Sequence, residues 1–406
     1  MGGIVWVVLR AGLFAAFILL AIAVPWGAAQ TRPIVPEPHR TTVATNGDEA
    51  CNACHAQGLS YVHTAHRATS ALATVPALEP LFRAAGAKLT ITGEPLPSLA
   101  FLMETKDGRS TQTAVTGWGN ETVRTSEPID IIVGSGRRGQ SFLYWSGNQL
   151  FELPVSYWKS GHRWINSPGY VDGTADFKRP VQPGCLECHA TAIVPLSSDL
   201  ATNSYVRDSF VPGIACRTCH GPGEEHIALE KAAAGAKVAN PAILNPANFS
   251  RDRQIDLCAV CHSGIQRTEL KPAFSYRPGE PLAQYFEPLP GSDQERPDVH
   301  GNQVGLLKRS RCFAASKTMT CSTCHDVHTT QRVFEVYAAK CLTCHQWQSC
   351  GEAHRIGPGI KDKCIGCHMP VQQTNVIVST TAGERLPASM RTHWIKVYGK
   401  DAESAP

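Results

Sequence analysis

The stretch CSTCHDVH, residues 321–328, decides how the rest of this sequence is interpreted. Two cysteines three positions apart are followed at once by His325, and a second histidine, His328, comes three residues later. On one helical turn the two thiols occupy neighbouring positions of one face, so both can reach the vinyl groups of a single porphyrin while His325 lies under its iron. The pattern Cys-x-x-Cys-His is associated with attachment of c-type haem.

The same pentapeptide occurs seven times, and together the copies use fourteen of the sixteen cysteines. Paired zinc motifs do not require a histidine after every pair, and a disulfide framework would give varied spacings. The repeat therefore predicts seven covalently attached haem c groups. The predicted thioether positions are Cys51, Cys54, Cys185, Cys188, Cys216, Cys219, Cys258, Cys261, Cys321, Cys324, Cys341, Cys344, Cys364 and Cys367.

Each predicted iron takes one axial ligand from its own motif. The seven motif histidines are His55, His189, His220, His262, His325, His345 and His368. Nine of the sixteen histidines remain, which is enough for a second histidine at every iron. Because His328 projects from the same side of a helix as His325, it cannot reach the opposite face of the same iron and must serve another haem or none.

The predicted distal ligands are His66, His226, His300, His328 and His393. His226 follows His220 by six residues across a Gly-Pro-Gly turn, so it too is expected to serve a neighbouring haem. His63 competes with His66 for one role, and four histidines can be either ligands or surface imidazoles: His39, His63, His162 and His354. If neighbouring haems share short peptides in this way, they are held close together.

Two cysteines, Cys312 and Cys350, lie outside the seven motifs. In an oxidising compartment they predict one disulfide around the fifth and sixth motifs. The alternative is two buried thiols that behave as small apolar side chains.

The N-terminus predicts export. An apolar run at residues 11–26 follows Arg10 and leads to small residues ending near Ala29, which is typical of a signal peptide over residues 1–29. The alternative is an uncleaved membrane anchor, and membrane contact is expected only in that case. Both alternatives place the rest of the chain in the periplasm or otherwise outside the cytoplasm. Lys and Arg are scattered despite the formal charge of +4, so no nucleic-acid partner is expected.

The chain divides by composition. A single-haem segment at residues 30–84 precedes a stretch of β-branched and aromatic residues, which predicts a β-rich subdomain at 85–178 with a hairpin in SFLYWSGNQLFEL. GSGRRG (134–139) matches a dinucleotide fingerprint, but it leads into a strand rather than a helix, so a glycine-rich strand connection is favoured. Its arginines, Arg137 and Arg138, are candidate donors to haem propionates.

The remaining motifs define a six-haem core at residues 179–380, followed by a tail at 381–406 that is expected to fold back and deliver His393. So dense a set of motifs leaves little room for an ordinary protein core. The predicted fold class is a multihaem cytochrome c, mostly irregular chain and short α-helices around a haem stack, with an inserted β-rich subdomain.

These features resemble the cytochrome c-552/4 (cytochrome c-554-like) family of multihaem cytochromes. The resemblance rests on the seven motifs, on GIACRTCHGPGEEH, MTCSTCHDVH and CIGCHMP, and on GQSFLYW, LFELPVSYW and NSPGYVDG leading into CLECHA. It implies closely stacked, mainly bis-histidine haems and exported electron transfer, with His226 and His328 matching distal ligands. The related hydroxylamine oxidoreductases and nitrite reductases add one open-coordinated haem, but here no motif ends in Lys, unlike the nitrite reductase pattern.

The expected function is periplasmic transfer of single electrons along the haems, in exchange with redox partner proteins and possible membrane quinol-oxidising complexes. One alternative is a reductase or oxidase of a small nitrogen or sulfur compound at a five-coordinate haem. Another is a structural subunit whose haems feed a separate catalytic partner.

Overall fold

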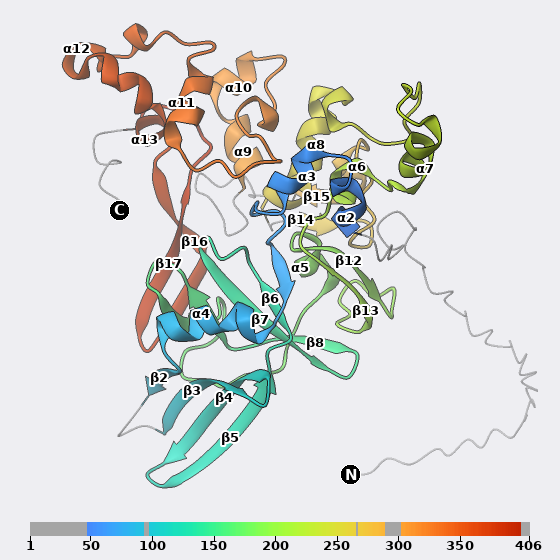
Figure 1. Cartoon of the computed structure of the whole chain (residues 1–406). Coiled ribbons are helices and arrows are strands. Elements are labelled where there is room, and N and C mark those ends of the chain that lie inside the picture. The colour runs from blue at the N-terminus through green and yellow to red at the C-terminus, as the bar shows by residue number, and fades with distance from the viewer. Residues whose placement is uncertain (1–46, 93–96, 265–266, 289–301, 399–406) are drawn as a thin grey trace, which may run out of the picture. The chain divides into compact units, whose positions relative to one another are not determined.

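The fold is described from a computed structural model of the chain (Figure 1). The structure describes residues 47–92, 97–264, 267–288 and 302–398. The predicted signal peptide, His39 and His300 lie outside these described residues. Among the described residues, none of the helices combines the length and apolarity that a membrane crossing requires.

A four-stranded antiparallel meander forms the first sheet. Its strands are β2 (Lys88–Thr92), β3 (Ser98–Lys106), β4 (Arg109–Trp118) and β5 (Glu121–Pro128), in that spatial order. The β3–β4 turn consists of Asp107 and Gly108, with φ of 51° and 74°. These left-handed values are those of a tight hairpin turn, which Asp-Gly adopts readily.

A second sheet carries the segment that leads to the second Cys-x-x-Cys-His motif. It contains β1 (Ser70–Leu72), β6 (Ile131–Val133), β7 (Gly139–Ser146), β8 (Gln149–Glu152), β9 (Val155–Trp158), β10 (Arg163–Asn166) and β11 (Arg179–Pro180). The predicted hairpin is confirmed, because β7 pairs with β8 across a turn at Gly147. The glycine-rich segment after β6 leads into β7, as predicted.

The two sheets and helix α4 (Val75–Ala85) close around one apolar core. Leu78, Phe101, Phe142, Leu153 and Val155 are each at most 1% exposed. We call residues 70–181 the β region. It begins before the boundary expected at residue 85, because β1 pairs with β6.

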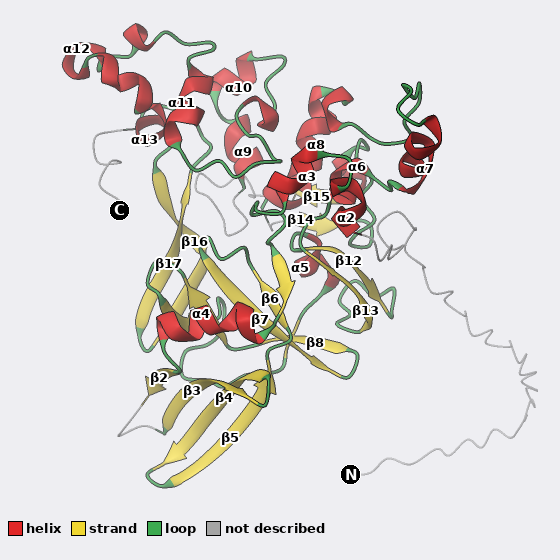
Figure 2. Cartoon of the chain, in the orientation of Figure 1, coloured by secondary structure: helices red, strands yellow, loops and turns green. Residues whose placement is uncertain are grey.

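The other described residues, which we call the motif region, consist of short helices and hairpins (Figure 2). The helices are α2 (Gly47–Asn52), α3 (Ala56–Tyr61), α5 (Pro183–Glu187), α6 (Cys216–His220), α7 (Glu224–Ala233), α8 (Arg251–His262), α9 (Gln303–Lys308), α10 (Arg311–Ala315), α11 (Phe334–Cys341), α12 (Ala353–Ile356) and α13 (Cys364–His368), with 3₁₀ turns η1 (Pro246–Asn248), η2 (Leu282–Gln284), η3 (Cys321–Thr323), η4 (Trp347–Ser349) and η5 (Pro358–Asp362).

Three antiparallel hairpins lie within the motif region, where mostly irregular chain was expected. They are β12 (Ala190–Pro195) with β13 (Tyr205–Pro212), β14 (Arg267–Glu269) with β15 (Phe286–Pro288), and β16 (Val371–Thr381) with β17 (Glu384–Arg391). Strand β16 crosses the expected boundary at residue 380. β-branched residues recur along β12, β13 and β16, which favours strands there, and each of these strands has a cross-strand partner.

The β16–β17 hairpin is attached to the β region. The side-chain amide of Asn166 donates to the Thr380 carbonyl oxygen at 2.7 Å. Asp172 accepts backbone N–H groups from Ala382 at 3.0 Å and Gly383 at 2.7 Å. These contacts fix the hairpin tip and therefore the chain that runs on to His393.

Candidate haem-binding sites

The motifs adopt the single helical turn that their spacing predicts. The backbone N–H of His55 donates to the Cys51 carbonyl oxygen at 2.9 Å, and His325 and His345 make the same bond to Cys321 and Cys341. Helices α6 and α13 each consist of one whole motif. Both thiols of a motif therefore lie beside the histidine that follows them, as porphyrin attachment requires.

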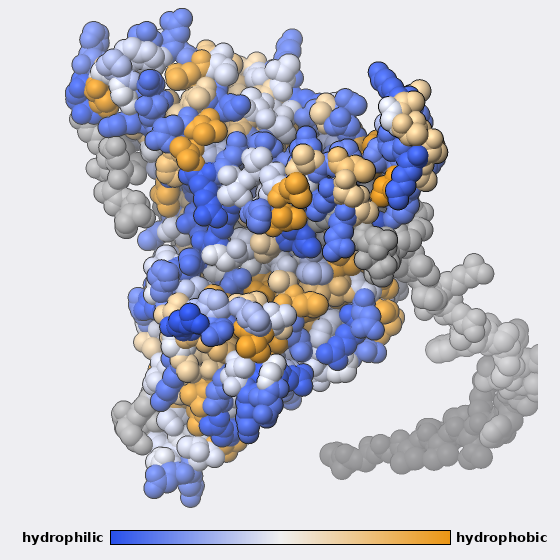
Figure 3. Space-filling view, in the orientation of Figure 1, coloured by the Kyte–Doolittle hydropathy of each residue, from blue (hydrophilic) through white to orange (hydrophobic). Residues whose placement is uncertain are grey.

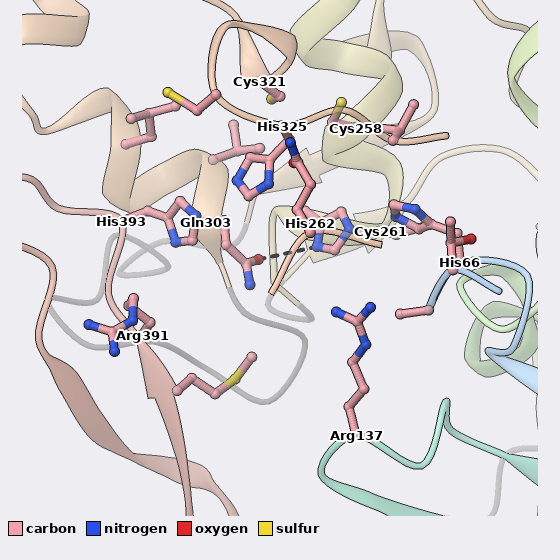
Figure 4. A pocket seen from close by; sticks show the side chains of 18 of the residues that line it. His66, Arg137, Cys258, Cys261, His262, Gln303, Cys321, His325, Arg391 and His393 are labelled. Atoms are coloured by element: carbon pink, nitrogen blue, oxygen red, sulfur yellow. Dashed lines mark hydrogen bonds between the residues drawn. The ribbon is translucent and has the colours of Figure 1, made fainter. Parts of the chain in front are cut away.

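Four motif histidines face a second histidine from elsewhere in the chain. Ring centres are 6.1 Å apart for His55 and His226, 6.0 Å for His262 and His66, 6.1 Å for His220 and His328, and 6.2 Å for His325 and His393. Figure 4 shows two of these pairs, His66 with His262 and His325 with His393. Four of the five predicted distal histidines thus lie against motif histidines.

The ring spacing fits an iron between each pair. Metal–imidazole bonds of about 2 Å, with roughly 1 Å from each nitrogen to its ring centre, put two ring centres about 6 Å apart across one metal. His328 faces His220 rather than His325, and His226 faces His55 rather than His220. Both arrangements follow the expectation that a histidine close behind a motif serves a neighbour. Their role as ligands remains a prediction.

Hydrogen bonds orient several of the rings. The Nδ1 atom of His220 lies 2.8 Å from the Leu244 carbonyl oxygen, and that of His226 lies 2.8 Å from the Pro241 carbonyl oxygen. The Nδ1 atom of His368 lies 2.9 Å from the Lys396 carbonyl oxygen. An Nδ1–H that donates to a carbonyl leaves the Nε2 lone pair for a metal. The sequence could not reveal these partners, because any residue carries a backbone carbonyl.

Burial favours the neutral form of two of the facing histidines, His66 and His393. It lowers the pKa of His66 to about 4, with further lowering by His262 and Arg137. Burial also lowers the pKa of His393 to about 4, and His325 adds to the effect. A metal binds the neutral imidazole, so these environments favour the ligand form at neutral pH.

Thiols of different motifs lie next to one another. Cys188 hydrogen-bonds to Cys261, Cys258 to Cys321, and Cys341 to Cys364. The bond to Cys261, followed by burial, raises the pKa of Cys188. Attachment points that belong to different predicted haems are therefore adjacent.

One large cavity joins all of these groups. Its volume is about 5130 Å³, and residues of every one of the seven motifs line it. A pocket for one small ligand or cofactor is typically about 300–1,000 Å³. The cavity is several times larger, so the lining residues fit several large prosthetic groups rather than one substrate.

The remaining histidines are placed differently. His189 Nδ1 lies 3.4 Å from the Thr69 carbonyl oxygen. His162 Nδ1 lies 3.2 Å from the Tyr157 hydroxyl between β9 and β10. Within the described part of the chain, no histidine ring faces His345 or His368 in the manner of the four pairs.

The predicted disulfide is wrong, since Cys312 and Cys350 are both free thiols. Cys312, on α10, lies close enough to Cys324 and Cys341 to raise their pKa together with burial. Cys350 has the same effect on Cys364. The two cysteines accompany different attachment sites, which a sequence count could not reveal.

Comparison with known proteins gives one match. The family model described as Cytochrome c554 and c-prime matches residues 158–221, which include the second and third motifs. No curated protein and no solved structure matches the chain. The family match supports a c-type cytochrome with covalently bound haem and a role in electron transfer.

Proposed function

We propose that this chain is an exported, periplasmic heptahaem cytochrome similar to the c-552/4 family, which passes single electrons along closely packed, mainly bis-histidine haems. The observation that carries the proposal is the set of four facing histidine pairs with ring centres 6.0–6.2 Å apart. In this proposal the motif cysteines and histidines hold the haems, and each haem iron supplies a one-electron couple. His300, outside the described residues, remains the proposed fifth distal ligand.

Short peptides support close packing. His220 and His226 lie six residues apart but face His328 and His55, so one peptide serves the sites of the first and third motifs. His325 and His328 connect the fifth and third motifs in the same way. Helices α2 and α6, far apart in sequence, lie side by side (Figure 1).

The fourth motif is a junction in this array. His262 faces His66, which follows the first motif. Its cysteines contact the second motif through Cys188 and the fifth through Cys321. The contacts support a branched array rather than a single file, with several routes by which electrons can enter or leave. We propose redox partner proteins, including a membrane quinol-oxidising complex, as donors and acceptors.

Replacing His328 by Ala tests the proposal. We expect one haem to change from low spin to high spin because its iron loses a strong-field ligand, while all seven haems stay attached. Electron paramagnetic resonance and mass spectrometry measure the two properties. His162→Ala is the matched control, since its ring bonds to Tyr157 and should leave every haem unchanged.

An unchanged low-spin spectrum in His328→Ala would contradict the ligand role. Mass spectrometry of the wild-type protein should show seven haem additions and an N-terminus near Gln30. Fewer additions would reject the proposed haem number.

A further inference from the structure

Glu152 lies at the boundary between the β region and the second motif. It is the last residue of β8 and pairs in register with Arg179 of β11, which leads within a few residues to Cys185 on α5. Glu152, Arg179 and Cys185 all line the large cavity. Burial raises the pKa of the Cys185 thiol, and the charge of Glu152 adds to this effect. A carboxyl group therefore lies within electrostatic range of the attachment site of the second predicted haem.

A chain of hydroxyl groups runs from Glu152 into the β region. Glu152 hydrogen-bonds to Ser141. Ser141 Oγ lies 2.8 Å from Ser156 Oγ, and Ser156 Oγ lies 2.8 Å from Ser167 Oγ. Ser167 ends the chain by donating to the Leu153 carbonyl oxygen at 2.7 Å.

The carbonyl at the end fixes the direction of every bond in this chain, because each hydroxyl has one proton. Ser167 uses its proton on Leu153, so Ser156 must donate to Ser167 and Ser141 must donate to Ser156. Ser141 then has only lone pairs left for Glu152. The chain is complete when the Glu152 carboxyl is protonated and donates to Ser141. When Glu152 is ionised, Ser141 turns its proton to the carboxylate, which lowers the pKa of Glu152, and the link from Ser141 to Ser156 is lost.

The groups around Glu152 oppose one another. Arg179 Nη1 lies 3.4 Å from Glu152 Oε2 and favours the carboxylate, but the same nitrogen donates to the Pro168 carbonyl oxygen at 2.7 Å. Burial outweighs Arg179 and raises the pKa of Glu152 to about 7. The other titratable groups on which the charge of Glu152 acts are Tyr170 and Cys185. Glu152 is therefore balanced between its two protonation states near neutral pH.

We propose that Glu152 is a redox-linked proton site, which binds one proton when the haem attached at Cys185 and Cys188 gains one electron and releases it on oxidation. This rests on the proposed function, because it requires a haem at the second motif. The electron comes from the redox donor and converts ferric to ferrous iron, and the proton comes from water and converts the carboxylate to a carboxylic acid. The added negative and positive charges balance, and no other bond changes.

The test is the pH dependence of the midpoint potentials of the holoprotein, measured by spectroelectrochemistry. Protonated Glu152 favours the reduced haem, so one haem potential should fall as pH rises around 7. One proton per electron corresponds to a tenfold change in the reduction equilibrium, or about 59 mV, per pH unit at most. In Glu152→Gln this slope should disappear.

Glu127→Gln is the matched control. Burial also raises the pKa of Glu127, but this residue does not line the cavity, so its replacement should leave the slope intact. His189→Met identifies the haem, because a methionine ligand raises the potential of the iron that it binds. The pH-dependent step of the redox titration should then shift to a higher potential together with this haem. If the pH-dependent step keeps its original potential, the assignment to the haem at Cys185 and Cys188 is overturned.

Ser156→Ala provides a second, independent measurement. It removes the acceptor for Ser141, which can then donate to the carboxylate, so the slope should persist with its inflection at lower pH. A slope that survives in Glu152→Gln, or an inflection unchanged in Ser156→Ala, overturns the proposal. Failure of the proposed function gives a different result, namely missing haems or the absence of one-electron reduction.

Discussion

The β region and the motif region obtain their interiors in different ways. In the β region, fifteen buried residues form one apolar cluster that includes Phe101, Phe142 and Trp164. The motif region has small clusters of its own, such as the four buried residues around Ile255 and Phe313, beside a cavity of about 5130 Å³. Leu186, Ile193 and Tyr205 of the motif region also belong to a ten-residue buried cluster that this region shares with the β region. In Figure 3, apolar residues also appear among hydrophilic ones over the helical part. The comparison indicates that the β region supplies its own core, whereas the motif region has little apolar core away from the cluster that it shares with the β region.

The largest test of this comparison is to produce the chain without haem attachment. We expect the β region to retain slowly exchanging backbone amides, because its hydrogen bonds enclose its own core. The motif region away from the cluster that it shares with the β region should exchange close to the rate of an unfolded chain. Hydrogen exchange with mass spectrometry measures both regions in one sample.

The holoprotein is the control, and both of its regions should be protected. If the motif region of the haem-free chain were as well protected from exchange as the β region, the proposed difference between the two regions would be wrong, because the motif region would then fold on its own contacts.

Phe101→Ala tests the β region alone. Phe101 is 0% exposed in the centre of the apolar cluster, and truncating a buried phenylalanine costs about 3–5 kcal/mol of unfolding free energy. Denaturant unfolding, followed by tryptophan fluorescence, should show this loss while the low-spin haem spectrum stays the same. Val123→Ala, on β5, is the control, because Val123 is 66% exposed and does not line the cavity. A changed haem spectrum in Phe101→Ala would mean that the two regions are not separable.

Asp172→Ala tests the link between the regions and has the smallest expected effect. It leaves the backbone N–H groups of Ala382 and Gly383 without their carboxylate acceptor, at a cost of about 1–3 kcal/mol. Amide exchange should accelerate first at the tip of the β16–β17 hairpin. Asp208→Ala, on the exposed side of β13, changes a similar charge without touching this link. Uniform acceleration across the β region would contradict a local role.

Many elements of the candidate site could be predicted because their signals are local. Motif spacing specifies a single turn, and that turn forms at residues as distant as Cys51 and Cys364. The short separation of His325 and His328 also rules out a shared iron before any fold is known. The disulfide prediction failed because it depended on which distant elements meet, and Cys312 and Cys350 accompany different sites.

The sequence by itself determined the positions of the seven Cys-x-x-Cys-His motifs, the β-rich character of the region before the second motif, and the histidines available as second ligands. These depend on residue type and spacing within a few turns of chain. Only the tertiary structure decided that His66 faces His262, that His393 faces His325, and that Glu152 and Cys185 line the same cavity. Such pairings depend on how distant segments pack, and residues that meet through packing leave no periodic or spacing signal along the chain.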